Sequence, residues 1–470
     1  MTSRTPEFPA PHEPGGYPHD DSFVSSLDAG VKEQPATNDN MHYHCVGVGA
    51  GPANLSLASL LHEHSEISNI FLDRKNQFSW HDDQQIDGAA LQVSPLKDLV
   101  TLSNPTNKFS FLSYLHEQGR IYHFLNAQFS AVPRKEFRNY LKWASSQNEN
   151  VVFGEDVRSV HFERDRFVIA TSHRRISADN LVVGVGSEPR VPSVAQLGRT
   201  QFHVNEFVSR SSDLANKRVA VVGGGQSGAE AVLDLISRPE RDLPRKVQWI
   251  SRRANFLPID DSPFTNDYFT PSYSDYFYAL DQRLRESINN ENVLASDGIS
   301  LATLQDIYQR AYVHRFVEGS TDFLELHPNR TVTAVKGEDG FPWRLSLVDN
   351  NCPTPETSIQ TDVVIWATGF RTAETSFLDP IAHRFEREGD EFRIDEDFAV
   401  NWDGPPDRNV FLQNAARKQR GVADPNLSLV AWRSQQILDR IRGARSTRQL
   451  ASFITWQLQI EPDHLLEHPR

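Results

Sequence analysis

Two glycine-rich turns restrict the possible folds of this sequence more than any other feature. Each turn lies between an apolar run typical of a β-strand and an apolar run typical of a helix. The glycines are Gly47, Gly49 and Gly51 in the first turn, and Gly223, Gly225 and Gly228, at full G-x-G-x-x-G spacing, in the second. Such a turn lets the backbone approach a pyrophosphate, which then lies at the N-terminus of the helix. The sequence therefore predicts two dinucleotide-binding units.

The two turns differ in the residue that ends the next strand-like run. Asp73 ends the run after the first turn, and an acid at this position suits a ribose hydroxyl. Arg252 and Arg253 follow the second turn, and arginine suits a 2′-phosphate. In the first turn Pro52 stands at the place of the third glycine, where the first turn of a helix tolerates proline. These differences predict FAD at the first unit and NADPH at the second.

The order of the expected elements predicts an α/β fold with two nested Rossmann-like dinucleotide-binding domains, for FAD and NADPH, and a small, mostly helical substrate region. The expected divisions are 1–40 as a disordered N-terminal tail, 41–205 as the first part of the FAD domain, 206–330 as the NADPH domain with the substrate-pocket segment, and 331–470 as the second part of the FAD domain with the C-terminal helix. The late apolar run 363–370 is expected to return to the FAD sheet, which would place Gly369 close to the flavin.

Composition excludes several classes of partner. A net charge of −14 argues against nucleic-acid binding, which needs a basic face. No stretch approaches the roughly 20 apolar residues that span a bilayer, and the first residues lack the apolar core of a signal peptide, so no membrane partner and a cytoplasmic location are expected. Cys45 and Cys352 are the only cysteines and lack C-x-x-C spacing, so neither a disulfide framework nor a metal site is expected.

Longer motifs extend over nearly all of the chain after residue 41. They are GVGAGPANLSLASL (47–60), FSWH (78–81), LQVSPLKDLVTLSNPTNKFSFLSYL (91–115), GGGQSGAE (223–230), SRRANF (251–256), NDYFTP (266–271), SDGIS (296–300), ATGFR (367–371) and ADPNLSLVAWRS (423–434). With these motifs the chain resembles the N-hydroxylating flavoprotein monooxygenases of siderophore biosynthesis, in particular the L-lysine N6-monooxygenase branch and its diamine-hydroxylating relatives.

The resemblance implies an NADPH- and FAD-dependent enzyme that N-hydroxylates the terminal amine of L-lysine or of a short diamine (cadaverine, putrescine or 1,3-diaminopropane), with O2 activated as a flavin C4a-hydroperoxide. The implied catalytic residues are Gln92, Lys97 and Gln226. The implied cofactor contacts, beyond the glycines of both turns, are Pro52, Asn54, Asp73, Trp80, His81, Gln92, Gln226, Ser227, Arg252, Arg253, Gly369, Asn426, Leu427 and Ser428. The implied substrate contacts are Lys97, Asn266, Phe269 and Leu429.

The choice between an amino acid and a diamine stays open at this point. Lys97 lies in an otherwise apolar, small-residue run and offers a cation for an α-carboxylate. A diamine lacks that carboxylate, and its distal ammonium would prefer an acid such as Asp260 or Asp261, which more often cap or turn a loop. The segment SDGIS differs from the Asn-containing version of the ornithine branch, which disfavours ornithine.

The reacting amine must be neutral, and burial lowers the pKa of an amine. Phe256, Tyr268 and Phe269 are therefore candidate walls of an apolar pocket. His81 is expected near the flavin pyrophosphate, and His203 is expected to be structural.

One departure from the family pattern is Arg420-Gly421, where His-Gly is usual. Two other functions remain as alternatives: a Baeyer–Villiger-type flavin monooxygenase, whose F-x-G-x-x-x-H signature this chain lacks, and a non-catalytic flavoprotein redox sensor. A homo-oligomer, either a dimer or a tetramer, is also considered.

Overall fold

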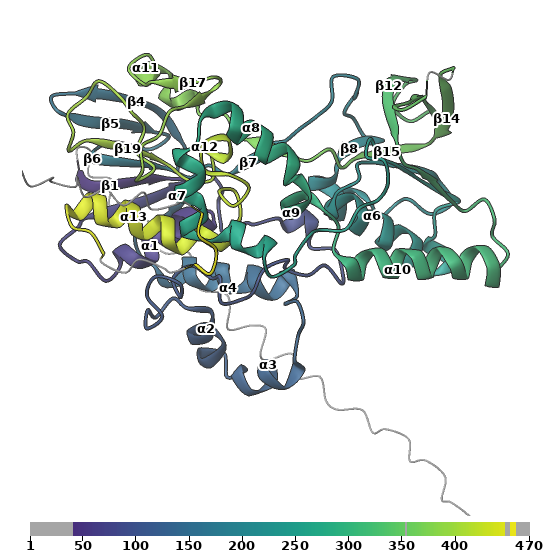
Figure 1. Cartoon of the computed structure of the whole chain (residues 1–470), viewed down its shortest axis with the longest axis horizontal. Coiled ribbons are helices and arrows are strands. Elements are labelled where there is room, and N and C mark those ends of the chain that lie inside the picture. Colours follow the sequence, from purple (N-terminus) through teal and green to yellow (C-terminus); the bar gives the residue numbers. More distant parts are fainter. Residues whose placement is uncertain (1–40, 353–354, 447–451, 457–470) are drawn as a thin grey trace, which may run out of the picture. The chain divides into compact units, whose positions relative to one another are not determined.

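The computed structural model describes residues 41–352, 355–446 and 452–456. The expected disordered tail, residues 1–40, lies outside the described residues. The described residues belong to one compact unit, built around two separate sheets with helices against them (Figure 1). The α/β class predicted from the sequence is confirmed.

The first sheet carries the first glycine turn. Its strand order is β3-β2-β1-β6-β5-β4, and β19 pairs with the second half of β6. β1, β2, β3, β6 and β19 are parallel, whereas β4 and β5 pair antiparallel. The strands are β1 (His42–Val48), β2 (Asn69–Asp73), β3 (Val151–Phe153), β4 (Val157–Glu163), β5 (Arg166–Thr171), β6 (Arg175–Val183) and β19 (Asn409–Leu412).

The second sheet carries the second glycine turn. Its order is β11-β10-β9-β15-β8, and every pair in it is parallel. A three-stranded antiparallel sheet, β12-β13-β14, packs beside it. The strands are β8 (Gln201–His203), β9 (Arg218–Val222), β10 (Lys246–Ile250), β11 (Leu324–His327), β12 (Arg330–Lys336), β13 (Trp343–Asp349), β14 (Thr357–Thr361) and β15 (Val363–Trp366).

Strand β15 corrects one expectation. It pairs with β9 and β8 in the second sheet, so the prediction that the run 363–370 returns to the first sheet is wrong. The strand that does return is β19, which pairs with β6. The composition of an apolar parallel strand fits either sheet. Only the strands with which it pairs decide to which sheet it belongs. The nesting of the second sheet within the first is confirmed, while the exact domain boundaries stay predictions.

A short two-stranded ribbon joins the segment that follows β6 of the first sheet to the segment that follows β15 of the second sheet. β7 (Ser187–Pro189) and β16 (Phe370–Thr372) pair antiparallel there. The carbonyl oxygen of Gly369 accepts a hydrogen bond from the backbone N–H of Arg190 at 2.9 Å and lies 3.1 Å from Nε2 of His203. His203 is buried, and this contact fits the structural role expected for it.

Both faces of each parallel sheet are buried, as the alternation of side chains along β9 illustrates. Val219 and Val221 join an apolar cluster with helix α6, while Ala220 and Val222 join a cluster with the three-stranded sheet. Successive side chains of a strand point to opposite faces, and parallel sheets are covered on both. A continuous apolar strand is therefore the pattern that this fold requires.

Helices alternate with the strands of both sheets along the chain. In the first unit α1 and α13 pack together, and in the second α6 and α10 do so (Figure 1). The helices are α1 (Pro52–Leu61), α2 (Phe111–Glu117), α3 (Ile121–Ala127), α4 (Arg134–Gln147), α5 (Phe207–Arg210), α6 (Gln226–Ser237), α7 (Pro271–Ala279), α8 (Gln282–Glu291), α9 (Val293–Asp297), α10 (Leu301–Tyr312), α11 (Asp379–Ala382), α12 (Arg417–Arg420) and α13 (Val430–Arg442). Within the described ranges, no helix is long and apolar enough to cross a bilayer.

A buried ion pair holds α13 to the loop before it. Nη1 of Arg433 lies 2.8 Å from Oδ1 of Asp424, and both side chains are only 1% exposed. The second carboxylate oxygen of Asp424 accepts a hydrogen bond from the backbone N–H of Ala416. Removing one member of such a pair leaves an uncompensated buried charge.

We expect Asp424→Ala to lower the free energy of unfolding by about 3–5 kcal/mol, because Arg433 is left without its partner. The matched control is Glu396→Ala, which breaks an exposed pair with Arg445 and is expected to cost less than about 1 kcal/mol. Urea unfolding followed by far-ultraviolet circular dichroism compares the two. Equal shifts of the unfolding midpoint would contradict the assignment of the Arg433–Asp424 pair as a core contact.

Candidate cofactor and amine site

The first glycine turn has the shape that a phosphate group needs. Gly49 has a φ of +91°, and a Cβ there would lie 2.5 Å from the carbonyl oxygen of Gly184. A Cβ on Gly51 would meet no atom within 4 Å, so the space in front of helix α1 is open. Gly51 is the N-cap of that helix, no side chain caps it, and Pro52 follows in the first turn as predicted. Uncapped N–H groups at a helix N-terminus favour an anion.

Asp73 and Asn54 both form hydrogen bonds to the backbone of this turn. The two carboxylate oxygens of Asp73 accept hydrogen bonds from the backbone N–H groups of Ala50 and Lys75, at 2.8 and 2.9 Å. Asn54 is fully buried, and its amide bonds to the carbonyl oxygens of Val48 and Gly49. Asn54 therefore supports the backbone of the turn. Its predicted contact with the cofactor stays a prediction.

Trp80 and His81 lie on the segment that follows β2. Their rings form an edge-to-face pair with centroids 4.7 Å apart, and Trp80 also packs against Phe137. His81 has a φ of +50°, in the left-handed region, and its Nδ1 lies 2.8 Å from Oε1 of Gln84. A non-glycine residue in that region often marks a functional segment. Their contact with the flavin stays a prediction.

At two positions of the second glycine turn there is no space for a side chain. A Cβ on Gly223, whose φ is +146°, would lie 1.9 Å from the carbonyl oxygen of Ala367. A Cβ on Gly228 would lie 2.4 Å from the carbonyl oxygen of Gly223, so the helix packs directly on the strand. Gly225 is the N-cap of α6 without a side-chain cap. This turn also leaves room and free N–H groups for a pyrophosphate.

The structure separates the roles of the two arginines after β10. Arg253 donates from Nη1 to the carbonyl oxygens of Gly224 and Asp297, at 2.9 and 2.8 Å, and so supports the glycine turn. Arg252 is exposed, and within the described residues its guanidinium has no ion pair or hydrogen bond. Arg252 is therefore the one whose guanidinium is available to a 2′-phosphate.

A groove of about 1130 Å³ brings two of the predicted catalytic residues together. Segments 86–95 and 129–132 line one side, and α6 and α10 line the other. Gln92 and Gln226 both face this groove although they come from different nucleotide units. The groove is therefore lined by residues of both units.

Gln226 is already engaged within the protein. Its Oε1 accepts a hydrogen bond from the backbone N–H of Ser300 at 2.7 Å, and its Nε2 donates to Oε1 of Glu230 at 2.9 Å. A direct contact with NADPH requires these bonds to be exchanged. Ser227, the neighbouring residue, is half-buried at the start of α6. The cofactor roles of Gln226 and Ser227 stay predictions.

An ion pair joins the two nucleotide units at the groove. Nη1 and Nη2 of Arg134, at the start of α4, donate to both carboxylate oxygens of Glu230 on α6, at 2.9 and 2.7 Å. Both side chains are largely buried. Sequence reasoning missed this pair, because nothing in the spacing of residues 134 and 230 indicates that α4 and α6 meet.

On the other side of segment 92–97, the predicted amine residues come together. Nζ of Lys97 donates to Oγ of Ser428 at 3.0 Å, and Ser428 in turn donates to Oδ1 of Asn426 at 2.8 Å. Nζ of Lys97 also lies 5.9 Å from the ring centroid of Phe269. Phe269 and Leu429 are buried in one small apolar cluster. The structure thus assembles a lysine, a hydroxyl, an amide and an apolar wall.

Lys97 is a half-buried cation without an acidic partner. Among the described residues it forms no ion pair, and burial lowers its pKa below the usual value. Its neighbour Asp98 does not neutralise it, because the Asp98 carboxylate accepts hydrogen bonds from the backbone N–H groups of Val100, Thr101 and Phe111. An anion is the ligand that such a site lacks.

Other candidates of the pocket are placed differently. Asn266 is exposed and bonds to the carbonyl oxygen of Asp261, so its substrate contact stays a prediction. Asp260 accepts hydrogen bonds from Ser262 and Thr265, and so it stabilises its own turn. Phe256 stacks on Trp249 at 3.7 Å between centroids and belongs to the second sheet's core. Its role as a pocket wall stays a prediction.

Arg420, which stands at the usual histidine position, has a clear structural contact. Its side chain is 1% exposed and pairs with Asp275 of α7 at 3.0 Å. The guanidinium also lies over the rings of Tyr278 and Phe398, at 4.2 and 4.4 Å from the centroids. Arg420 therefore attaches α7, which follows the NDYF segment, to α12.

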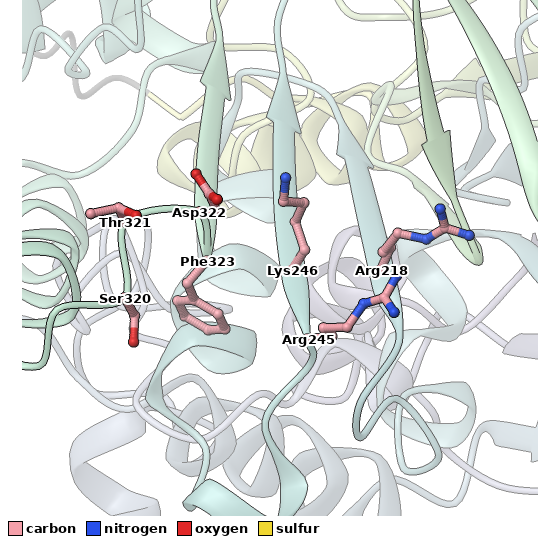
Figure 2. A pocket seen from close by; sticks show the side chains of 7 residues that line it. All are labelled: Arg218, Arg245, Lys246, Ser320, Thr321, Asp322 and Phe323. Atoms are coloured by element: carbon pink, nitrogen blue, oxygen red, sulfur yellow. The ribbon is translucent and has the colours of Figure 1, made fainter.

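A second hollow lies away from these contacts. It measures about 540 Å³, and Figure 2 shows Arg218, Arg245 and Lys246 around it, at the start of β9 and β10. The glycine turn follows the opposite end of β9. Arg218 pairs with Asp362 and Lys246 pairs with Glu325, so two of the three cations are already neutralised. We place neither cofactor there.

Comparison with known proteins gives a consistent result. Residues 41–372 match the family model described as L-lysine 6-monooxygenase/L-ornithine 5-monooxygenase. The chain is 37% identical to L-lysine N6-monooxygenase of Escherichia coli, over 85% of this chain and 94% of that protein.

Solved structures agree. A cadaverine monooxygenase from Erwinia amylovora, solved with FAD, has a TM-score of 0.84 and 26% identity over 90% of this chain and 100% of that chain. An ornithine N-hydroxylase from Kutzneria sp. 744, solved with reduced FAD, NADP+ and L-ornithine, has a TM-score of 0.79 and 28% identity over 86% of this chain and 99% of that chain.

We expect Arg252→Ala to raise the KM for NADPH by about 10- to 150-fold, because a charge-assisted contact to the 2′-phosphate contributes about 1.5–3 kcal/mol. The KM for NADH should stay within about twofold, since NADH lacks that phosphate. Arg253→Ala should weaken both dinucleotides, because it removes two bonds to the turn. Steady-state kinetics with both dinucleotides, and with the exposed Arg241→Ala as control, makes the comparison. An unchanged NADPH-to-NADH preference in Arg252→Ala would refute the assignment.

Proposed function

Because the chain belongs to the L-lysine 6-monooxygenase/L-ornithine 5-monooxygenase family, we propose that it hydroxylates the terminal amine of L-lysine with FAD and NADPH as cofactors. The family resemblance that the motifs indicated is confirmed. One turnover converts the amine, O2, NADPH and a proton into the hydroxylamine, NADP+ and water. The Baeyer–Villiger and redox-sensor alternatives are disfavoured by this membership.

The observation that carries the choice of substrate is the state of Lys97. This half-buried cation has no acidic partner among the described residues, and its Nζ contacts a hydroxyl beside an apolar wall. The α-carboxylate of an amino acid would complete its charge balance. A diamine would instead bring a second cation toward Lys97, which costs Coulomb energy. Asp260, one acid suggested as an alternative partner, is committed to its own turn.

The surroundings of Lys97 also support the protonation state that the reaction needs. A nucleophilic amine must be neutral, and burial is what lowers the pKa of Lys97 itself. A substrate amine placed against Phe269 and Leu429 would experience the same loss of solvation. The pocket would therefore increase the fraction of neutral amine.

The two glycine turns fit the cofactors expected of such an enzyme. The turn with Asp73 would hold FAD, and the turn followed by Arg252 would hold NADPH, with Gln92 between them and the amine. NADPH supplies a hydride, and bound reduced FAD supplies the activation of O2. The protein's part is to orient both, to exclude water from the groove and to hold the carboxylate of the substrate beside Lys97 and Ser428.

The hydroxylamine product can be converted into a ligand for Fe(III). Acylation of a hydroxylamine gives a hydroxamate, whose two oxygens bind Fe(III). We therefore infer a place in hydroxamate siderophore biosynthesis. The amine substrate, O2 and both cofactors are the expected partners, and a dimer or tetramer stays a prediction.

The purified holoenzyme should consume NADPH faster and form hydroxylamine when L-lysine is added. We expect L-lysine to give a higher kcat/KM than cadaverine, putrescine or 1,3-diaminopropane, because only L-lysine pairs with Lys97. NADPH oxidation and a colorimetric hydroxylamine assay measure this. A higher kcat/KM with cadaverine would replace L-lysine by a diamine, and NADPH oxidation that ignores every amine would overturn the proposed function.

Lys97→Met is expected to raise the KM for L-lysine by about 10- to 150-fold, through loss of a charged contact that contributes about 1.5–3 kcal/mol. The rate of flavin reduction by NADPH should stay within about twofold, because Lys97 does not line the groove. The exposed Lys142→Met serves as the control. An unchanged KM for L-lysine in Lys97→Met would contradict the role in carboxylate binding.

A further inference from the structure

A tryptophan near the C-terminus packs on the segment that carries the amine pocket. The Trp456 ring lies 4.7 Å from the ring of Tyr273, and 5.9 Å from the rings of Tyr268 and Tyr276. The contact with Tyr276 is stacked, and the contact with Tyr273 is edge-to-face. Both are favourable aromatic geometries.

These tyrosines lead directly to the predicted amine pocket. Tyr268 packs on the apolar cluster that contains Phe269 and Leu429. Phe269 follows Tyr268 in the chain, and its ring lies beside Nζ of Lys97. Trp456 therefore forms an outer layer over the wall that faces Lys97.

Trp456 is the main anchor within its short segment. Phe453 is fully exposed, at 102%, and within the described residues it has no ring contact. The indole Nε1 of Trp456 is buried without a hydrogen-bond partner among the described residues. A buried tryptophan N–H normally finds an acceptor, so ring contacts rather than a hydrogen bond hold Trp456 in this packing.

The opposite side of α7 is held independently. Arg420 pairs with Asp275 and lies over Tyr278, both on α7. The helix is thus fixed from α12 on one side and is covered by Trp456 on another. Loss of Trp456 would uncover the tyrosines without removing that attachment.

We propose that Trp456 is a positioning residue for the amine pocket, which holds the segment of Tyr268 and Phe269 against Lys97 and keeps water out. This inference rests on the proposed function for the identity of the amine. Its consequence is a coupled reaction, in which each NADPH yields one hydroxylamine. When water enters, NADPH, a proton and O2 yield NADP+ and H2O2 instead, and the amine is left unchanged.

Trp456→Ala in the full-length holoenzyme is the direct test, with Phe453→Ala as the matched control. We expect Trp456→Ala to raise the KM for L-lysine about tenfold, from the loss of ring contacts and of a dry wall, and to increase the share of NADPH that ends as H2O2 at saturating L-lysine. The rate of flavin reduction should stay within about twofold, because Trp456 does not line the groove. Phe453→Ala should leave all of these quantities unchanged.

Two further measurements keep the result decisive. Trp456→Phe keeps an aromatic ring but lacks the indole N–H, and its KM for L-lysine should stay within about threefold of the wild type. If the indole N–H were the important group, Trp456→Phe would instead behave like Trp456→Ala. Calorimetric titration of L-lysine into each holoenzyme reports amine binding without turnover, and Trp456→Ala should bind more weakly. Wild-type KM, coupling and affinity in Trp456→Ala, or equal losses in Phe453→Ala, would overturn the proposal. Wild-type enzyme that forms no hydroxylamine from any amine would instead refute the proposed function.

Discussion

Two nucleotide-binding units can exchange a hydride only if contacts hold the units side by side, and this requirement dominates the structure. The Arg134–Glu230 ion pair is the contact that meets it most directly, because it joins α4 of the first unit to α6 of the second at the groove. Glu230 also accepts a hydrogen bond from Gln226, so the pair fixes a predicted catalytic residue as well. A buried ion pair offsets the free-energy cost of its desolvation only when further hydrogen bonds satisfy its other polar atoms. Arg134 donates such a bond to the carbonyl oxygen of Gln84, and Glu230 accepts one from Gln226.

Pairing of buried charges also distinguishes the residues around the predicted amine site. The buried arginines Arg420 and Arg433 each have an acidic partner, Asp275 and Asp424. Lys97 differs from them, since within the described ranges it has only hydroxyl and aromatic contacts. Where every neighbouring cation is neutralised, the one that is not becomes the natural place for an anionic group of a ligand.

Local backbone geometry explains what could be predicted. Gly49 and Gly223 need conformations or close approaches that other residues cannot adopt, so they can be recognised from spacing alone. Asp73 and Arg252 could also be predicted, because the end of the strand next to a glycine turn has a fixed place relative to that turn. The residues of the amine site were named by resemblance to a family, and the structure then brought Lys97 to Ser428.

The sequence by itself determined the α/β class, the two nucleotide turns and the nesting of one unit in the other, because these depend on short-range pattern and chain order. Tertiary structure alone decided that strand β15 joins the second sheet, that Asn54 is buried behind its turn and that Phe256 stacks on Trp249. It also decided that Trp456 packs on Tyr268. Each of these depends on which surfaces meet across long separations in sequence, and no local spacing encodes such a meeting.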